Sequence, residues 1–343
     1  MQDSLFDEPP DDDPSPPSTG PRRPRPKVAP ARFDEDHRRL RAALPARLRL
    51  GTSSWNFTGW SGLVWDRAYP EATLSRHGLN AYAQHPLLRT VSLDRVFYRP
   101  LSAAEYAAYA NVVPEDFRFV VKAPSVVTDP MIRGEGGRGL QRNPTFLDSD
   151  LAVRAFAEPA LQGLRHRLGA LNFQLSPMPA ELLAQPAALI ERMATMLRAL
   201  PDLRTIAPEA VVSIEVRDPA MLTPAFAQML RSCGATYCLG LHAKMPAIDE
   251  QLPMLRALWP GPLVCRWNLH RRHGAYGYEE AEQRYGNFDR LIDPDPDTRA
   301  ALARVLVATT DAGFPAYVTI DNKAEGSAPL SVVELARRVT DQQ

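Results

Sequence analysis

The stretch that decides the fold of this chain is Val211-Val212-Ser213-Ile214-Glu215-Val216-Arg217-Asp218-Pro219. Four apolar β-forming residues follow one another almost without interruption, which predicts a strand that is covered on both faces. Side chains alternate across a strand, so Ser213, Glu215 and Arg217 share one face. Two charged side chains on the inner face of a packed sheet are costly unless they are paired. Their position at the carboxyl end of a buried strand is typical of an α/β active-site rim, although a structural ion pair gives the same pattern.

Similar apolar segments occur along the rest of the chain, with helical patterns between them. We expect strands at Leu48–Ser53, Thr90–Asp94, Phe117–Lys122, Leu171–Leu175, Val211–Arg217, Thr236–Leu241, Leu263–Asn268 and Ala316–Asp321. The clearest helical patterns are Ala103–Ala110, Ala152–Leu168, Pro186–Leu200, Pro224–Ser232, Pro253–Leu258, Thr298–Ala312 and Pro329–Val339. Eight strands that alternate with helices predict an α/β fold, a TIM-like (β/α)8 barrel over residues 48–343. A doubly wound open sheet is the alternative, but no Gly-x-Gly-x-x-Gly motif follows the first strand.

Composition limits the class of protein. The chain has 343 residues, of which 45% are hydrophobic, enough for one large core. Lys plus Arg and Asp plus Glu both number 40, so the overall charge favours neither nucleic acid nor a membrane as partner. Three scattered cysteines indicate a reducing, cytoplasmic compartment. No apolar run approaches the ~20 residues that a membrane span needs.

The amino-terminal residues have a different character. We expect residues 1–47 to form a disordered, acidic and Pro-rich tail, because they have too little apolar surface to become ordered. Within them, Gln2-Asp3-Ser4-Leu5-Phe6 resembles the Gln-x-x-Leu-Phe peptide by which bacterial proteins dock on the DNA sliding clamp. The resemblance implies the sliding clamp as a partner and a role in nucleic-acid maintenance. A solvated tail also contains such five-residue patterns by chance.

Polar residues stand at the carboxyl end of every expected strand, and in a closed barrel these ends surround one cavity. The residues that we expect to bind the substrate are Asp94, Tyr98, Gln174, Arg217, Arg266, Asn268, Arg271 and Asn322. The catalytic candidates are Glu215 or Asp321 as the general base and Lys122 or Arg217 as the charge stabiliser. The long connections 128–150 and 269–297 also follow strands, and such loops are usually lids or binding loops.

The expected ligand is a small anion, either phosphorylated or sugar-like. Glu215 can pair with Arg217, and if Asp218 points outward, Arg266, Arg271 and Arg272 are expected to outnumber the carboxylates near them. A guanidinium group suits a phosphate or carboxylate. No metal-ligand spacing and no Gly-x-Ser-x-Gly motif occurs, so we expect no metal centre, no cofactor and no nucleophilic serine. The remaining enzyme class is a hydrolase, lyase or isomerase that uses carboxylate acid–base chemistry. A non-catalytic ligand-binding barrel is the alternative.

Six ordered motifs carry a resemblance to a known family. They are Gly51-Thr52-Ser53-Ser54-Trp55, Phe97-Tyr98-Arg99-Pro100, Phe117–Pro124, Phe173–Pro177, Glu215-Val216-Arg217 and Asp321–Pro329. In this order they resemble the domain-of-unknown-function 72 family (DUF72, the YecE-like proteins) over about residues 48–340. The resemblance implies a TIM-barrel-like fold and no settled activity.

Overall fold

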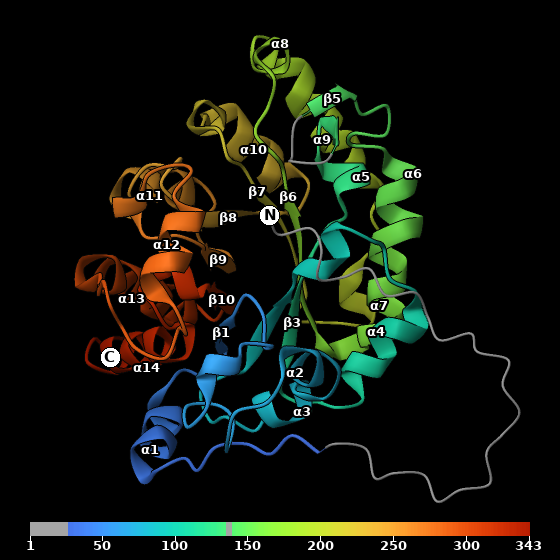
Figure 1. Ribbon diagram of the computed structural model, residues 1–343. Helices are drawn as coiled ribbons and strands as arrows, with labels where there is room; N and C mark the ends of the chain where they lie inside the picture. Colours follow the sequence, from blue (N-terminus) through green and yellow to red (C-terminus); the bar gives the residue numbers. More distant parts are fainter. Residues whose placement is uncertain (1–26, 135–138) are drawn as a thin grey trace, which may run out of the picture.

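The computed structural model describes residues 27–134 and 139–343, and within these ranges eight parallel strands close into a barrel (Figure 1). Around the barrel the strands follow the order β1-β10-β9-β8-β7-β6-β3-β2. They are β1 (Leu48–Thr52), β2 (Thr90–Leu93), β3 (Arg118–Lys122), β6 (Leu168–Gln174), β7 (Val211–Glu215), β8 (Thr236–Leu241), β9 (Leu263–Trp267) and β10 (Ala316–Ile320). This topology confirms the predicted TIM-like barrel, because an open sheet would leave β1 and β10 unpaired, whereas they are paired along their length.

Helices lie around the outside of the barrel (Figure 1). They are α1 (Glu35–Ala43), α2 (Glu71–His77), α3 (Leu79–Tyr82), α4 (Ala103–Ala110), α5 (Ser125–Thr128), α6 (Ser149–Ala152), α7 (Glu158–Leu164), α8 (Ala180–Leu183), α9 (Pro186–Ala199), α10 (Pro224–Ser232), α11 (Ile248–Ala257), α12 (Tyr278–Tyr285), α13 (Pro296–Asp311) and α14 (Ala328–Thr340). A short antiparallel pair, β4 (Met131–Arg133) and β5 (Gly139–Arg142), lies in the loop after β3. Across the two described ranges, no helix is both long and apolar enough to pass through a bilayer.

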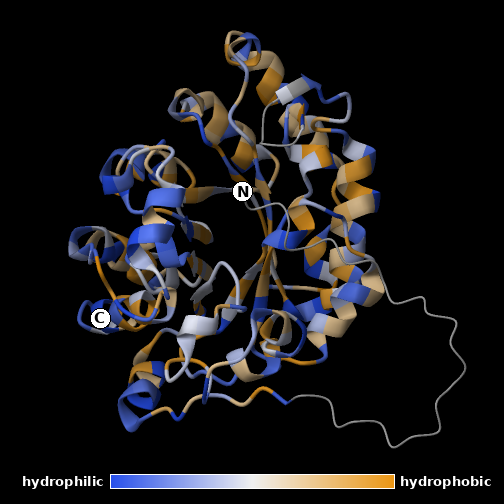
Figure 2. Cartoon of the chain, in the orientation of Figure 1, coloured by the Kyte–Doolittle hydropathy of each residue, from blue (hydrophilic) through white to orange (hydrophobic). Residues whose placement is uncertain are grey.

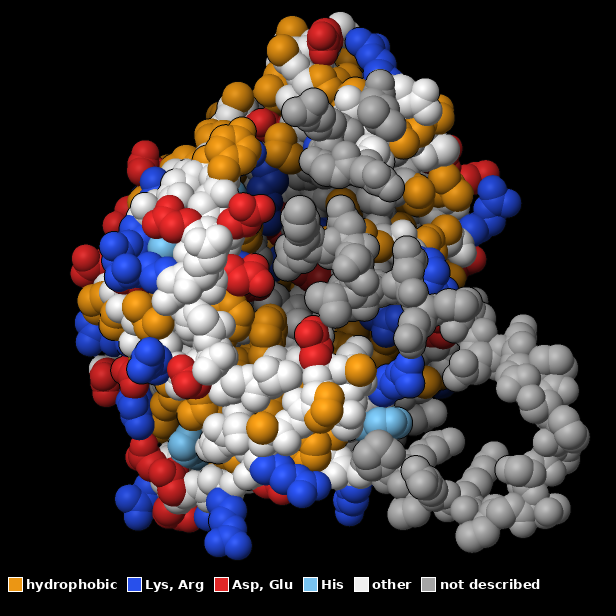
Figure 3. Space-filling model, in the orientation of Figure 1, with side chains coloured by type: hydrophobic (Ala, Val, Ile, Leu, Met, Phe, Trp, Pro, Cys, Tyr) orange, Lys and Arg blue, Asp and Glu red, His pale blue; other side chains and the backbone are white. Residues whose placement is uncertain are grey.

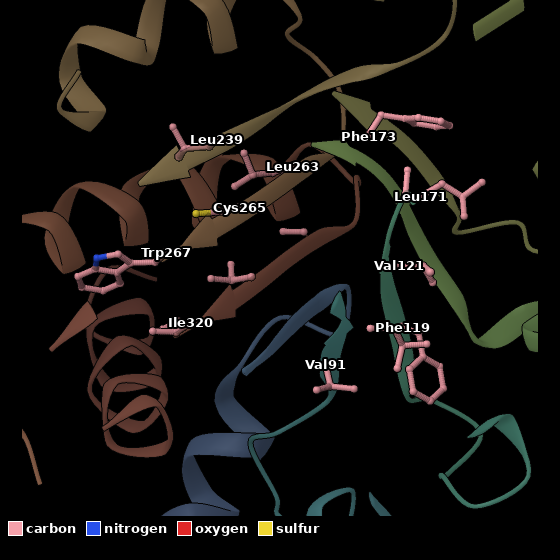
Figure 4. Packing of buried hydrophobic residues seen from close by; sticks show 14 of the residues in the cluster. Val91, Phe119, Val121, Leu171, Phe173, Leu239, Leu263, Cys265, Trp267 and Ile320 are labelled. Atoms are coloured by element: carbon pink, nitrogen blue, oxygen red, sulfur yellow. The ribbon is translucent and has the colours of Figure 1, made fainter. Parts of the chain in front are cut away.

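The main hydrophobic core lies between the strands and the helices. Alternate residues of the strands point outward into it and are buried, as Figure 4 shows for Val91, Phe119, Val121, Leu171, Phe173, Leu239, Leu263, Cys265, Trp267 and Ile320. In Figure 2 the hydrophobic colours accordingly concentrate on the central strands. Burying one large apolar side chain contributes ~1.5–3 kcal/mol, so this layer supplies much of the free energy that closes the barrel.

The interior of the barrel is filled from its amino-terminal end. At that end Glu209 accepts from Arg118 at 2.9 Å, and its backbone carbonyl accepts from the hydroxyl of Tyr317 at 2.9 Å. Above this pair lies a small apolar layer of Val120, Ala170, Val211, Cys238, Val264 and Tyr317. Tyr317 fits because its neighbour is Gly169, where a Cβ would lie 2.8 Å from the Tyr317 ring. These side chains fill the amino-terminal end of the barrel interior, so a ligand would have to bind at the carboxyl end.

The structure corrects two of the predicted helices. The pattern at Ala152–Leu168 is not one α-helix, because it contains a π-helical turn at Val153–Ala157 and a 3-10 turn at Arg165–Arg167. Leu168 already belongs to β6, where it pairs with Phe119. The helix expected from Pro253 onward begins earlier, at Ile248, and Pro253 lies inside it. In both cases the packing against neighbouring elements overrides the local signal.

The ordered structure begins earlier than residue 48. Val28 and Leu44 are buried, and α1 packs against α14, with Asp36 3.1 Å from Arg337. Asp34 caps this helix by accepting from the backbone N–H of His37 at 3.1 Å. The predicted tail boundary at residue 47 therefore lies too late in the chain, because a few apolar contacts and a cap suffice to order this segment. The predicted clamp-binding segment, residues 2–6, lies outside the described residues.

Candidate functional site

A cavity of about 800 Å³ opens at the carboxyl end of the barrel. Each of the eight strands, or the residues that directly follow it, contributes to the wall, through Ser53, Asp94, Lys122, Gln174, Arg217, His242, Arg266, Asn268 and Asp321. The volume falls in the range of ~300–1,000 Å³ that is usual for small-molecule sites. The structure thus brings together the side chains that the sequence placed at separate strand ends.

The floor of the cavity is an ion-paired cluster centred on Glu215. Its Oε1 lies 2.7 Å from Nη2 of Arg217, and its Oε2 lies 2.9 Å from Nη1 of Arg266. Asn172 donates to Oε2 at 3.0 Å and accepts from the hydroxyl of Ser213 at 2.9 Å. Glu215 and Arg217 point inward, as the strand alternation predicts, because only there does each find its partner.

These contacts make Glu215 unsuitable as a general base. Burial raises the pKa of its carboxyl group, but the guanidinium groups of Arg217 and Arg266 outweigh burial and lower the pKa to about 2. A carboxylate held this strongly in the ionised state is a poor proton acceptor near neutral pH. Its geometry fits a different role, in which one buried anion fixes the position of two guanidinium groups.

Arg266 has more partners than the sequence suggested. Besides Glu215 it contacts Oδ2 of Asp94 at 2.5 Å and Oε1 of Gln174 at 2.6 Å. Burial lowers the pKa of this guanidinium group, and the charges of Asp94 and Glu215 more than reverse that effect. The expected shortage of carboxylates is therefore wrong for Arg266, whose charge is neutralised within the protein.

Lys122 stands apart from this cluster. It follows Val121 at the carboxyl end of β3, lines the cavity, and its Nζ lies 3.8 Å from the centroid of the Phe97 ring. Among the described residues it has no hydrogen-bond or ion-pair partner within bonding distance. Burial lowers the pKa of its ammonium group to about 8, with Asp94 opposing and Arg266 assisting that shift. A cavity-facing amine with this pKa is present in both protonation states near neutral pH.

Asp321 forms part of the opposite wall. Its Oδ2 accepts from the hydroxyl of Ser53 at 2.7 Å, and its Oδ1 accepts from the backbone N–H of Lys323 at 2.9 Å. Asn268 donates weakly to Oε1 of Glu215 at 3.5 Å and also lines the cavity. Asp321 is a wall carboxylate without an arginine partner among the described residues, so its oxygens can also accept hydrogen bonds from a ligand.

Aromatic and basic side chains surround the opening. Tyr98, which the sequence predicted as a binding residue, is 65% exposed there. Tyr276, which is 84% exposed, belongs to the loop 269–297 that was expected to be a lid or binding loop, although it was not among the predicted binding residues. Lys244 lies with its Nζ 4.2 Å from the Tyr276 ring centroid. The length of the loop after β9 is the signal that could have identified Tyr276, because long loops at this face carry binding residues. Figure 3 shows that charges of both signs are interspersed over the face turned to the viewer.

Two predicted binding residues do not reach the cavity. Arg271 donates from Nη1 to the backbone carbonyl of Met245 and lines a separate, smaller pocket beside α11. Asn322 is buried and uses its Oδ1 to accept from Nε1 of Trp60 at 3.2 Å and from the backbone N–H of Ala328 at 2.8 Å. Each is held by a partner outside the cavity, so both residues have structural contacts and neither lines the substrate site.

His242 also lines the cavity. Burial, assisted by Arg217, lowers the pKa of His242 to about 4, and its Nδ1 accepts from the backbone N–H of Lys244 at 3.0 Å. A neutral, hydrogen-bonded histidine agrees with a structural role. In the ranges that the structure describes, no group of three or more His, Cys, Asp or Glu side chains is arranged to hold a metal ion.

The family model that describes a protein of unknown function, DUF72, matches residues 49–343. The chain belongs to the DUF72 family. A crystal structure of a DUF72 family protein from Enterococcus faecalis V583 is 19% identical, with a TM-score of 0.55 over 85% of this chain and 95% of that chain. A DUF72 family protein from Thermotoga maritima MSB8 is 16% identical, with a TM-score of 0.52 over 84% of this chain and 98% of that chain.

At such low identity these similarities establish the DUF72 barrel and not an activity. No curated protein sequence matches the chain significantly. The chemistry of this DUF72 member must therefore be inferred from its own cavity.

Proposed function

We propose that this DUF72 protein is a metal-independent enzyme that acts on a small, anionic, sugar-like substrate at the carboxyl end of its barrel. The observation that carries the proposal is Lys122, a cavity-facing amine without a hydrogen-bond partner among the described residues. A basic group that the fold keeps half-buried and unpaired costs stability, and such groups cluster at functional sites. Lys122 replaces Glu215 as the group that exchanges protons with the substrate.

The character of the substrate follows from the groups around Lys122. Arg217 and Lys122 supply positive charge at one side. The Nε–H groups of Arg217 and Arg266 have no acceptor among the residues that the structure describes, so donors exceed acceptors there. Asp321, Ser53 and Asn268 offer the polar groups that bind hydroxyls on the other side. The exposed aromatic rings at the opening provide flat apolar faces such as those that cover sugar rings.

The test combines binding with turnover. Thermal-shift titrations with phosphate, sulfate, sugar phosphates and sugar acids identify ligands, and NMR of the same mixtures detects their conversion. We expect Lys122→Met to weaken anion binding ~10–100-fold, because a charge-assisted hydrogen bond contributes ~1.5–3 kcal/mol. The exposed Lys27→Met is the matched control and leaves binding unchanged. If no anion stabilises the wild-type protein, or if Lys122→Met binds it equally well, the proposal fails.

One observation favours the second candidate, a non-catalytic ligand-binding barrel. Glu215 is paired with two arginines, so this fully buried carboxylate organises the site instead of reacting. The same titrations separate the candidates. A ligand that binds through Lys122 but is never converted supports the binding barrel, whereas conversion that is lost in Lys122→Met supports the enzyme.

A further inference from the structure

We propose that Lys122 is an imine-forming lysine, and that the substrate is a small anionic hydroxy-aldehyde or hydroxy-ketone, such as a sugar phosphate in its open-chain form. This inference rests on the proposed function, because it names the reaction by which Lys122 engages the substrate. It goes further in requiring a carbonyl group on the ligand. Three independent features of the chain lead to it.

The first feature is the distribution of lysines. The whole chain has four, Lys27, Lys122, Lys244 and Lys323, and all its other basic residues apart from histidine are arginines. Three of the four line the cavity. Arginine binds anions at least as well as lysine does, but a guanidinium group stays protonated and cannot form an imine. A chain that uses arginine nearly everywhere and keeps lysine around one cavity indicates a need for primary amines there.

The second feature separates Lys122 from the other two cavity lysines. Nζ of Lys323 lies 3.4 Å from Oε2 of Glu282, so a carboxylate already contacts this amine. Lys244 lies at the opening, against the exposed ring of Tyr276. Lys122 lies at the floor, against the Phe97 ring and without a carboxylate in contact among the described residues. It is therefore the lysine whose nitrogen lone pair is most readily made available.

The third feature is the charge that surrounds Lys122. Asp94 and Glu215 are negative and Arg217 and Arg266 are positive, and each carboxylate is already bound to a guanidinium group. Burial therefore dominates, and it lowers the pKa of Lys122 from 10.5 to about 8. A shift of about two and a half units makes the neutral amine ~300-fold more abundant at neutral pH than in an ordinary lysine. Lysines that form Schiff bases are activated in this way.

The reaction needs no redox partner. The lone pair of neutral Nζ adds to the carbonyl carbon, the π pair moves to the oxygen, and this oxygen takes up a proton. Nitrogen then loses a proton, the hydroxyl is protonated and leaves as water, and the nitrogen lone pair closes the C=N bond. The sum is one amine, one carbonyl and one proton giving one protonated imine and one water. The protons are exchanged with water, and the negative charge of Asp94, which lines the cavity and acts electrostatically on Lys122, favours the protonated imine.

Reductive trapping tests this inference directly. The full-length protein is incubated with dihydroxyacetone phosphate and sodium cyanoborohydride, and the labelled lysines are identified by peptide mass spectrometry. We expect Lys122 to be labelled at least ~100-fold faster than Lys27 because of its larger neutral fraction, with a rate that rises as the pH approaches 8. Glycerol 3-phosphate, which has no carbonyl group, should protect Lys122. Lys122→Arg keeps the positive charge and should abolish this label, whereas Lys27→Arg should leave the labelling of Lys122 unchanged.

The outcomes separate the imine from the proposed function. Equal labelling of the four lysines, or no adduct on Lys122, overturns the imine. If glycerol 3-phosphate still stabilises the wild-type protein and not Lys122→Met, the anionic site of the proposed function stands without the imine. If neither an adduct nor stabilisation is found, both proposals are wrong.

Discussion

Replacing Glu215 with glutamine tests the central claim about the cavity floor. The two side chains have almost the same volume, so Glu215→Gln removes one charge without opening a cavity. Arg266 keeps Asp94 at 2.5 Å, whereas Arg217 keeps a hydrogen bond to the amide oxygen of Gln174 at 3.2 Å, which carries no charge. Removing one partner of a buried ion pair costs ~3–5 kcal/mol. We expect a loss of ~3 kcal/mol, at the lower end, because one of the two arginines remains paired.

Urea unfolding followed by tryptophan fluorescence measures this loss, and the melting temperature should fall by ~5 °C. Asp94→Asn is the matched control, since it removes the other carboxylate of Arg266. Its side chain is 34% exposed, so solvent screens the pair and the expected loss is only ~1 kcal/mol. Added phosphate should restore more stability to Glu215→Gln than to the wild-type protein, because it replaces the missing negative charge. A loss for Glu215→Gln that is no larger than that for Asp94→Asn refutes the reasoning.

Three further predictions concern other parts of the molecule. The pKa of Glu215 lies at about 2 in the folded protein, below its ordinary value of 4.5, so the stability that Glu215 contributes is complete above pH 4.5 and is lost as the pH falls toward 2. The urea midpoint of the wild-type protein should therefore drop more steeply between pH 5 and 3 than that of Glu215→Gln. Parallel curves for the two proteins would contradict this. At the amino-terminal end, Glu209→Gln should cost ~1–2 kcal/mol, since Glu209 is partly exposed, while anion-induced thermal shifts stay unchanged because the cavity is at the other end. The clamp-binding segment stays a prediction: purified sliding clamp should bind the full-length chain in surface plasmon resonance, and a Leu5→Ala, Phe6→Ala double variant should lose that binding, so equal responses would rule the segment out.

Local patterns in the sequence were sufficient to predict the barrel. Apolar segments with alternating side chains give the strands, and the helical patterns between them give the parallel connections. The same alternation by itself places Glu215 and Arg217 on the inner face of the sheet. Two places show the limits of the local signal. Leu168 was predicted to end a helix but is the first residue of β6, and α1, which was predicted to be disordered, packs against α14.

Only the tertiary structure decided what the inward-facing groups do. Arg266 and Asp94 are 172 residues apart in the sequence, so no local pattern reveals that they pair and that Arg266 therefore lacks no counter-charge. Arg271 and Asn322 follow strands like the true cavity residues, yet backbone partners outside the cavity hold them away. Lys122 is singled out for the opposite reason, because the fold gives every charge around it another partner. Pairing and burial depend on neighbours brought together by closure of the barrel, which is why the sequence determined the candidates and the fold selected among them.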